Sequence, residues 1–167
     1  MNTVHTLQEY VVALRDAGIL TGCTVPEALL GRGVECLTYD TRTLRENALF
    51  ICKGAHFKEE YLRDALSHGA FAYVAEQQHD VDAPCILVSD IRYSLVVLGQ
   101  LFYDHVTDKL TSIGITGTKG KSTTAYYVRY ILNDWLRAQD RNECAILSSI
   151  DNYDGKVSEE SHITTPE

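Results

Sequence analysis

A glycine-rich segment with two lysines and several hydroxyl groups, Gly114-Ile-Thr-Gly-Thr-Lys-Gly-Lys-Ser-Thr123, contains the residue types that bind phosphate. Glycines permit positive φ, so backbone amides can converge on an anion, and the start of a following helix attracts the same negative charge. We expect the Lys121 ammonium to be the catalytic group that reaches the β- and γ-phosphates, and the Ser122 hydroxyl to coordinate Mg²⁺. The residues predicted to surround the phosphates of a nucleotide are Gly117, Thr118, Lys119, Gly120, Lys121, Ser122 and Thr123.

The segment departs from the strict pattern G-x-x-x-x-G-K-[ST], because Ile115 occupies the position of the first glycine. An alternative interpretation is a glycine turn that happens to precede Lys-Ser. The order of the surrounding elements favours a phosphate site: the β-branched run Leu110–Thr116 predicts a buried strand before the glycines, and Lys121–Trp135 predicts a helix after them. A further strand is expected over Cys144–Ile150.

The residues upstream predict a separate small α/β domain. Thr6 and Glu9 form a capping-box pattern at the start of a helix that Gly18 would end. Further helices are expected over Lys58–His68 and Ile91–Tyr103, and strands over Cys36–Asp40, Ala48–Cys52, Phe71–Ala75 and Cys85–Val88. Asp90 follows the last of these strands and is expected to end it rather than to bind magnesium. We predict a mixed α/β domain over residues 1–107 and the start of a parallel-sheet phosphate-loop (Walker-A) ATPase domain over residues 108–167.

Composition excludes several classes of protein. The formal net charge is −8 and no block of Lys or Arg is present, which argues against nucleic acid and anionic membranes as partners. No apolar run is long enough to span a membrane, and the N-terminus lacks the features of a signal peptide, so we expect a cytoplasmic protein. The five cysteines form no C-x-x-C pair and are expected to be core thiols rather than a disulfide framework or a zinc site.

The loop Gly117-Thr-Lys-Gly-Lys-Ser-Thr123 resembles the G-T-N-G-K-[ST]-[ST] loop of the Mur ligases and the folylpolyglutamate synthetases. In this resemblance Lys119 stands for the usual Asn and Ser122 for the usual Thr. The serine keeps the metal-binding hydroxyl, and the extra lysine adds positive charge beside the phosphates. The resemblance implies ATP and Mg²⁺ as cofactors.

Two segments upstream of the phosphate loop distinguish the Mur ligases from the folylpolyglutamate synthetases. Leu37-Thr-Tyr-Asp-Thr-Arg42 and Ala48-Leu-Phe-Ile-Cys-Lys-Gly54 resemble the D-S-R … G-D-L-F-V-A-x-x-G signature of the N-terminal domain in the MurE type of Mur ligase. Asp64-Ala-Leu-Ser-His-Gly-Ala70 resembles the A-x-x-x-G-A-x-A element of the same domain. That domain holds the uridine diphosphate of UDP-N-acetylmuramoyl-L-alanyl-D-glutamate. The resemblance implies that the uridine and pyrophosphate are contacted by Tyr39, Thr41, Ala55, His56 and Phe57. The alternatives are that Thr41 and Arg42 cap a turn and that His56 is a solvated loop residue.

The segment Ser161-His-Ile-Thr-Thr-Pro-Glu167 resembles the T-T-P-[DE] element of MurE-type enzymes. By this resemblance, Thr164 and Thr165 offer hydroxyl groups to the muramoyl-peptide substrate. The alternative is a disordered polar tail. Lys119 and Ser161 resemble the lysine-adding branch of the family more than the diaminopimelate-adding branch.

The resemblance implies a monomeric, ATP-dependent ligase that adds a diamino acid, lysine rather than diaminopimelate, to UDP-N-acetylmuramoyl-L-alanyl-D-glutamate. Its carbamylated lysine, second-metal ligands and amino-acid-binding domain have no counterpart in these residues, so we expect a truncated ligase that is inactive by itself. Two alternatives stay open. One is a non-catalytic UDP-sugar-binding module, and the other is a different phosphate-loop ligase such as a folylpolyglutamate synthetase, although the upstream signature counts against the latter.

Overall fold

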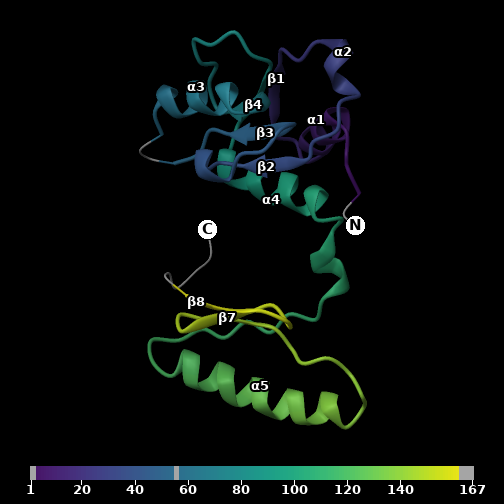
Figure 1. Ribbon diagram of the computed structural model, residues 1–167, viewed down its shortest axis with the longest axis vertical. Coiled ribbons are helices and arrows are strands. Elements are labelled where there is room, and N and C mark those ends of the chain that lie inside the picture. Colours follow the sequence, from purple (N-terminus) through teal and green to yellow (C-terminus); the bar gives the residue numbers. More distant parts are fainter. Residues whose placement is uncertain (1–2, 55–56, 162–167) are drawn as a thin grey trace. The chain divides into compact units, whose positions relative to one another are not determined.

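The computed structural model describes residues 3–54 and 57–161. The chain divides between Thr111 and Ser112 into two compact units, each with its own sheet (Figure 1). The interpretation of the first unit as a nucleotide-sugar domain and of the second as an ATP-binding domain stays a prediction.

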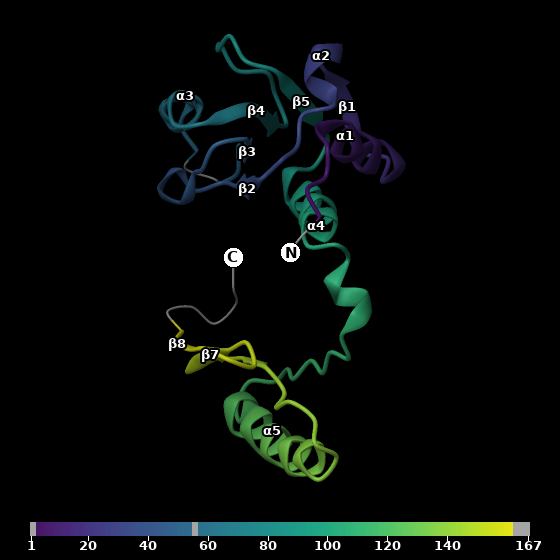
Figure 2. The same cartoon turned by 45° about the vertical axis from the view of Figure 1, so that its right-hand side comes forward.

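The first unit is built on a five-stranded sheet with the order β1-β5-β4-β3-β2. Strands β2 (Cys36–Thr38), β3 (Ala48–Ile51), β4 (Ala70–Ala75) and β5 (Cys85–Val88) pair in parallel. Strand β1 (Leu20–Cys23) runs antiparallel to β5 at one edge (Figure 2). The expected mixed α/β class is therefore confirmed, whereas β1 was not anticipated from the sequence.

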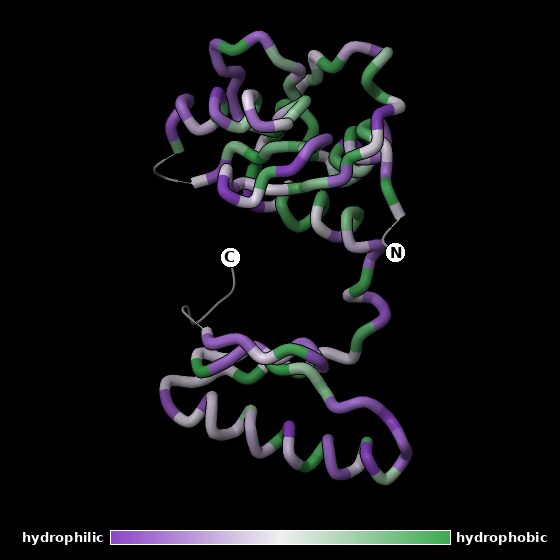
Figure 3. Tube along the Cα trace, viewed as in Figure 1, coloured by the Kyte–Doolittle hydropathy of each residue, from purple (hydrophilic) through white to green (hydrophobic). Residues whose placement is uncertain are grey.

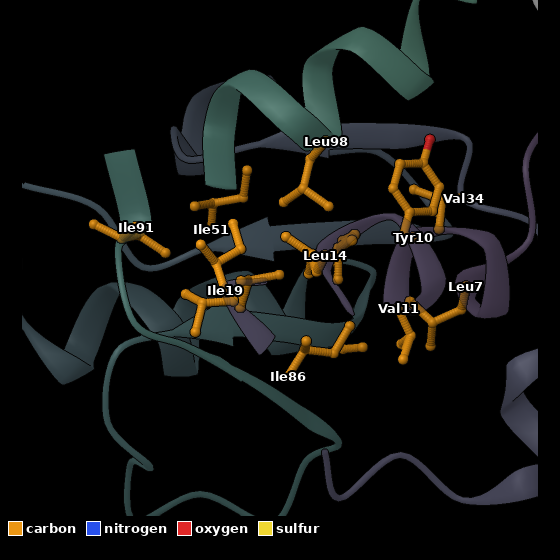
Figure 4. Close-up of a cluster of buried hydrophobic side chains, with 14 residues drawn as sticks. Leu7, Tyr10, Val11, Leu14, Ile19, Val34, Ile51, Ile86, Ile91 and Leu98 are labelled. Carbon is orange, nitrogen blue, oxygen red and sulfur yellow. The ribbon is translucent and has the colours of Figure 1, made fainter. Parts of the chain in front are cut away.

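Helices cover both faces of this sheet. Helices α1 (Leu7–Asp16) and α4 (Ile91–Phe102) pack on one face, α3 (Glu59–Ser67) packs on the other, and the short α2 (Glu27–Leu30) follows β1. Strand β3 shows the arrangement, since Leu49 and Ile51 point to the first face while Ala48 and Phe50 point to the second. The buried side chains on the first face are drawn in Figure 4, and the middle of the first unit is mostly hydrophobic in Figure 3. A sheet buried on both faces explains why these strands read as continuous apolar runs.

The helix starts follow the local sequence. At α1 the Thr6 amide donates to Glu9 Oε2 at 2.7 Å, so the predicted capping box forms. At α4 the Asp90 carboxylate accepts hydrogen bonds from the amides of Arg92 and Tyr93, both at 2.9 Å. Asp90 therefore caps α4, and the prediction that it ends a strand lies two residues from the observed end of β5 at Val88.

The second unit contains a long helix and a small antiparallel sheet. Helix α5 spans Lys121–Arg137, and strands β6 (Ile146–Leu147), β7 (Asp151–Tyr153) and β8 (Ser158–Glu160) pair in that order. The predicted strand over Leu110–Thr116 is wrong, because these residues form no strand and Leu110 and Ile113 are 60% and 58% exposed. A β-branched run becomes a strand only when neighbouring strands pair with it, and none of the described strands does so.

The second unit also buries little apolar surface. Among its described residues, Ile146 is the one buried hydrophobic side chain, while Tyr127, Tyr130, Ile131 and Trp135 of α5 are more than half exposed. The described strands of this unit are antiparallel, so the parallel sheet of a phosphate-loop domain stays a prediction here.

Within the described residues, no helix is both long and apolar enough to cross a membrane. All five cysteines are free thiols. Cys36, Cys52 and Cys85 are buried as predicted, but Cys23 on the edge strand β1 is exposed, so the expectation of a core thiol is wrong for Cys23.

Candidate functional site

The predicted phosphate loop leads directly into α5. Gly120 is the residue before the helix and has φ of 77°, and Gly117 has φ of 151°. Both values lie in the region that favours glycine, so the backbone can turn sharply before the helix begins. The loop residues Thr118, Lys119 and Gly120 are exposed.

The amide groups of this loop are free to bind an anion. Within the described part of the chain, no acceptor takes a hydrogen bond from the backbone amides of residues 118–123. The first amides of a helix have no partner inside the helix, and the helix dipole makes this end positive. The Lys121 ammonium lies beside them and donates to the Gly117 carbonyl oxygen at 2.8 Å. The loop therefore presents the Lys121 ammonium and several amide donors at one place.

The Ser122 hydroxyl has a neighbour that the sequence did not indicate. Its Oγ lies 3.3 Å from Oγ of Ser149, in the turn between β6 and β7. This turn is held by Ser148, whose Oγ accepts from the Asp151 amide at 3.2 Å and donates to the Asp151 carbonyl at 2.9 Å. A hydrogen bond from Tyr126 to Asp151 fixes the turn on α5 and raises the pKa of the tyrosine. The turn thus brings a second hydroxyl to the predicted metal ligand.

These groups fit a magnesium–nucleotide complex. No cluster of three or more His, Cys, Asp or Glu side chains able to hold a metal occurs in residues 3–54 and 57–161. Mg²⁺ at a phosphate loop needs few protein ligands, because the phosphates and water supply most of its oxygens. The Ser122 hydroxyl, next to the free amides, is an oxygen group of the kind that could serve as such a ligand.

Two of the predicted nucleotide-sugar residues, Tyr39 and Thr41, lie just after the carboxyl end of β2, at the sheet edge where ligands of parallel sheets bind. Tyr39 follows β2 and is half-buried, and Thr41 begins a short 3₁₀ turn over Thr41–Thr43. Asp40 caps this turn by accepting from the Arg42 amide at 3.0 Å, and its carboxylate forms an ion pair with the Arg42 guanidinium at 2.6 Å. These hydrogen bonds from Arg42 lower the pKa of Asp40 to about 2. Arg42 therefore stabilises the turn, while the Thr41 hydroxyl has no hydrogen-bond partner among the described residues.

The loop after β3 places two side chains differently. Lys53 lies with its ammonium 4.5 Å from the centre of the Tyr39 ring. Phe57 packs instead toward α3, with its ring centre 5.3 Å from that of His79 and 6.4 Å from that of Tyr61. Phe57 thus anchors the far end of the loop, and Lys53 was missed by the sequence reasoning because only the folded chain brings it to Tyr39.

Four predicted site residues lie outside the described residues. They are Ala55, His56, Thr164 and Thr165. Their predicted substrate contacts stay predictions.

The chain has clear sequence relatives among ligases. No family model matches the chain. A UDP-N-acetylmuramoyl-L-alanyl-D-glutamate–L-lysine ligase from Enterococcus faecalis is 42% identical over 146 residues, which are 86% of this chain and 28% of the ligase. The ligase of the same name from Streptococcus thermophilus is 42% identical over 132 residues, covering 78% of this chain and 26% of the ligase. The chain thus spans under a third of the length of these relatives.

Solved structures show the same fold. MurF from Acinetobacter baumannii superposes with a TM-score of 0.57 at 21% identity, over 80% of this chain and 28% of that structure. A UDP-N-acetylmuramoyl-L-alanyl-D-glutamate–2,6-diaminopimelate ligase superposes with a TM-score of 0.60 at 17% identity, over 90% of this chain and 28% of that structure. Taken together with the sequence relatives, these similarities show that the chain, over its matched residues, belongs to the Mur ligase family and to its MurE type.

Proposed function

We propose that the chain is part of an ATP-dependent ligase that adds L-lysine to UDP-N-acetylmuramoyl-L-alanyl-D-glutamate during peptidoglycan precursor synthesis. The observation that carries this proposal is the group of free amides, Lys121 and Ser122 at the start of α5. The names of the relatives supply the substrates, and they favour lysine over diaminopimelate and a muramoyl-peptide ligase over a folylpolyglutamate synthetase.

In the proposed reaction the γ-carboxylate of D-glutamate attacks the γ-phosphorus of ATP, giving an acyl phosphate and ADP. The amine of lysine then attacks the acyl carbon, forming the amide and releasing phosphate and a proton. Lys121 would leave the Gly117 carbonyl and move to the transferring phosphoryl group, whose charge it and the loop amides neutralise. The Ser122 hydroxyl would help to hold Mg²⁺, which would supply further neutralisation of phosphate charge. This chain therefore contributes positioning and charge rather than a general base.

We further propose that this chain by itself does not catalyse the ligase reaction. The second unit leaves one face of α5 exposed, with Tyr127, Tyr130, Ile131 and Trp135 in contact with solvent. A helix with apolar side chains on opposite sides is normally covered by other parts of the protein on both of those sides. The phosphate loop at its start would therefore hold its geometry less firmly than a fully packed domain holds it.

The role of Lys121 is tested in a ligase that contains these residues together with the rest of a full-length relative. Removing one charge-stabilising group commonly costs about 3–4 kcal/mol of barrier, so Lys121→Ala should lower kcat at least about a hundredfold. The matched control is Lys156→Ala, which removes an exposed lysine of the turn between β7 and β8 and should leave more than about a tenth of the activity. Near-normal turnover by the Lys121 variant would exclude its proposed role.

The second candidate is a UDP-sugar-binding module without catalysis. It is favoured by the first unit, which has a five-stranded sheet and two clusters of buried hydrophobic side chains. Calorimetry on the chain with UDP-N-acetylmuramoyl-L-alanyl-D-glutamate and, separately, with Mg·ATP distinguishes the two. Binding of both ligands supports the ligase assignment, whereas binding of the uridine ligand without ATP favours the module.

A further inference from the structure

The carboxyl edge of the first sheet carries few charges that are free to bind a ligand. Strand β2 is followed by Asp40 and Arg42, which neutralise each other in an ion pair of 2.6 Å. Strand β4 is followed by Glu76, whose Oε1 accepts a hydrogen bond from the Ile91 amide at 3.0 Å. Both carboxylates and the arginine are therefore occupied in holding local structure.

Lys53, after β3, is different. No carboxylate of the described residues forms an ion pair with it, and its ammonium lies over the Tyr39 ring at 4.5 Å. The ring attracts the cation through its negative π-face but offers no hydrogen-bond acceptor to it. The lysine is thus held near Tyr39 while its three N–H donors stay available to an anion.

The position of this lysine matches the position of the proposed ligand. Strands β2 and β3 are adjacent and parallel, with Thr38 opposite Phe50, so the segments that follow them lie at the same sheet edge. Tyr39 and the free hydroxyl of Thr41 belong to one segment and Lys53 to the other. An oxygen of a diphosphate would accept charge-assisted hydrogen bonds from the Lys53 ammonium. These hydrogen bonds are stronger than the contact between the ammonium and the Tyr39 ring.

We propose that Lys53 is the cation that binds the pyrophosphate of the uridine-linked sugar, and that Tyr39 holds its ammonium in place before the ligand arrives. This inference rests on the proposed function, since it assumes that a uridine diphosphate binds at this edge. It assigns the pyrophosphate to a residue of the loop that the sequence reasoning had not selected.

The test is calorimetric titration of the full chain with UDP and with uridine. Lys53→Met should raise the Kd for UDP about tenfold or more, which corresponds to about 1.4 kcal/mol, and should leave the Kd for uridine unchanged because uridine carries no phosphate. Lys53→Arg should restore UDP binding, since it keeps the charge. The matched control is Lys58→Met, which removes another lysine of the same loop region, one that is exposed and precedes α3; its Kd for UDP should equal that of the wild-type chain.

The possible results separate the inference from the proposed function. If the wild-type chain binds UDP and Lys53→Met binds it equally well, the role of Lys53 is overturned while the uridine site stands. Equal weakening by Lys53→Met and Lys58→Met would also overturn it, because the effect would then be one of general charge. If the wild-type chain binds neither UDP nor UDP-N-acetylmuramoyl-L-alanyl-D-glutamate, the proposed uridine site fails, and the role of Lys53 fails with it.

Discussion

Gly69 lies at a close approach between two backbone segments of the first unit. It follows α3 and precedes β4, and its φ is 112°. A Cβ atom placed on it would lie 2.9 Å from the Arg45 carbonyl oxygen and 3.1 Å from the Glu46 Cα. Both neighbours are backbone atoms just before β3, and the Ala48 amide donates to the Gly69 oxygen at 3.2 Å. Neither segment can move aside without disturbing the pairing of β3 with β4.

Gly69→Ala should therefore destabilise the first unit strongly. The positive φ costs an alanine about 1–2 kcal/mol, and forcing a methyl group against fixed backbone costs about 1–3 kcal/mol more. The sum, about 2–5 kcal/mol, is a large share of the roughly 5–15 kcal/mol that stabilises a typical domain. The melting temperature should fall by about 10 °C or more.

The assay is urea and thermal unfolding of the chain followed by far-UV circular dichroism, with the fluorescence of Trp135 reporting separately on the second unit. Gly31→Ala is the matched control, because Gly31 has φ of −77° and nothing lies within 4 Å of its would-be Cβ. There, alanine should stabilise by about 0.4–1 kcal/mol through the unfolded state. A Gly69→Ala protein whose stability lies within about 0.5 kcal/mol of that control would refute the reasoning.

Two further predictions concern thiols and pH. Burial raises the pKa of the Cys52 thiol to about 12, whereas the Cys23 thiol is exposed. A thiol reagent at pH 8 should therefore label Cys23 quickly and Cys52 only after unfolding. If the Cys52→Ser variant lost the fast phase of labelling, that phase would belong to Cys52 and the prediction would be wrong. Hydrogen bonds to Glu9 and Asp104 raise the pKa of His5 above 6.5, so the protonated ring is stabilised in the folded state. That stabilisation is complete below the unfolded pKa and is lost as pH rises through the folded one. His5→Gln should therefore destabilise the chain more at pH 5.5 than at pH 9, and an equal effect at both pH values would count against the ion pairs.

The sequence determined the local elements of the first unit. Helices α1, α3 and α4 and strands β2 to β5 lie within a few residues of their predicted bounds, because apolar periodicity and caps such as Thr6 act over a few neighbouring residues. The phosphate loop could also be predicted from the sequence, because the amides, Lys121 and Ser122 all belong to one short segment at the start of a helix. Which of its residues touch a nucleotide stays a prediction.

The tertiary structure decided what depends on segments that are distant in sequence. Strand β1 exists because β5 pairs with it, and Leu110–Thr116 is no strand because none of the described strands pairs with it, although its composition is the more strand-like of the two. Lys53 meets Tyr39 only because β2 and β3 are adjacent, and Ser149 meets Ser122 only because the turn after β6 is fixed to α5. Propensity and spacing describe neighbours along the chain, whereas these contacts depend on the path that the whole chain takes through space.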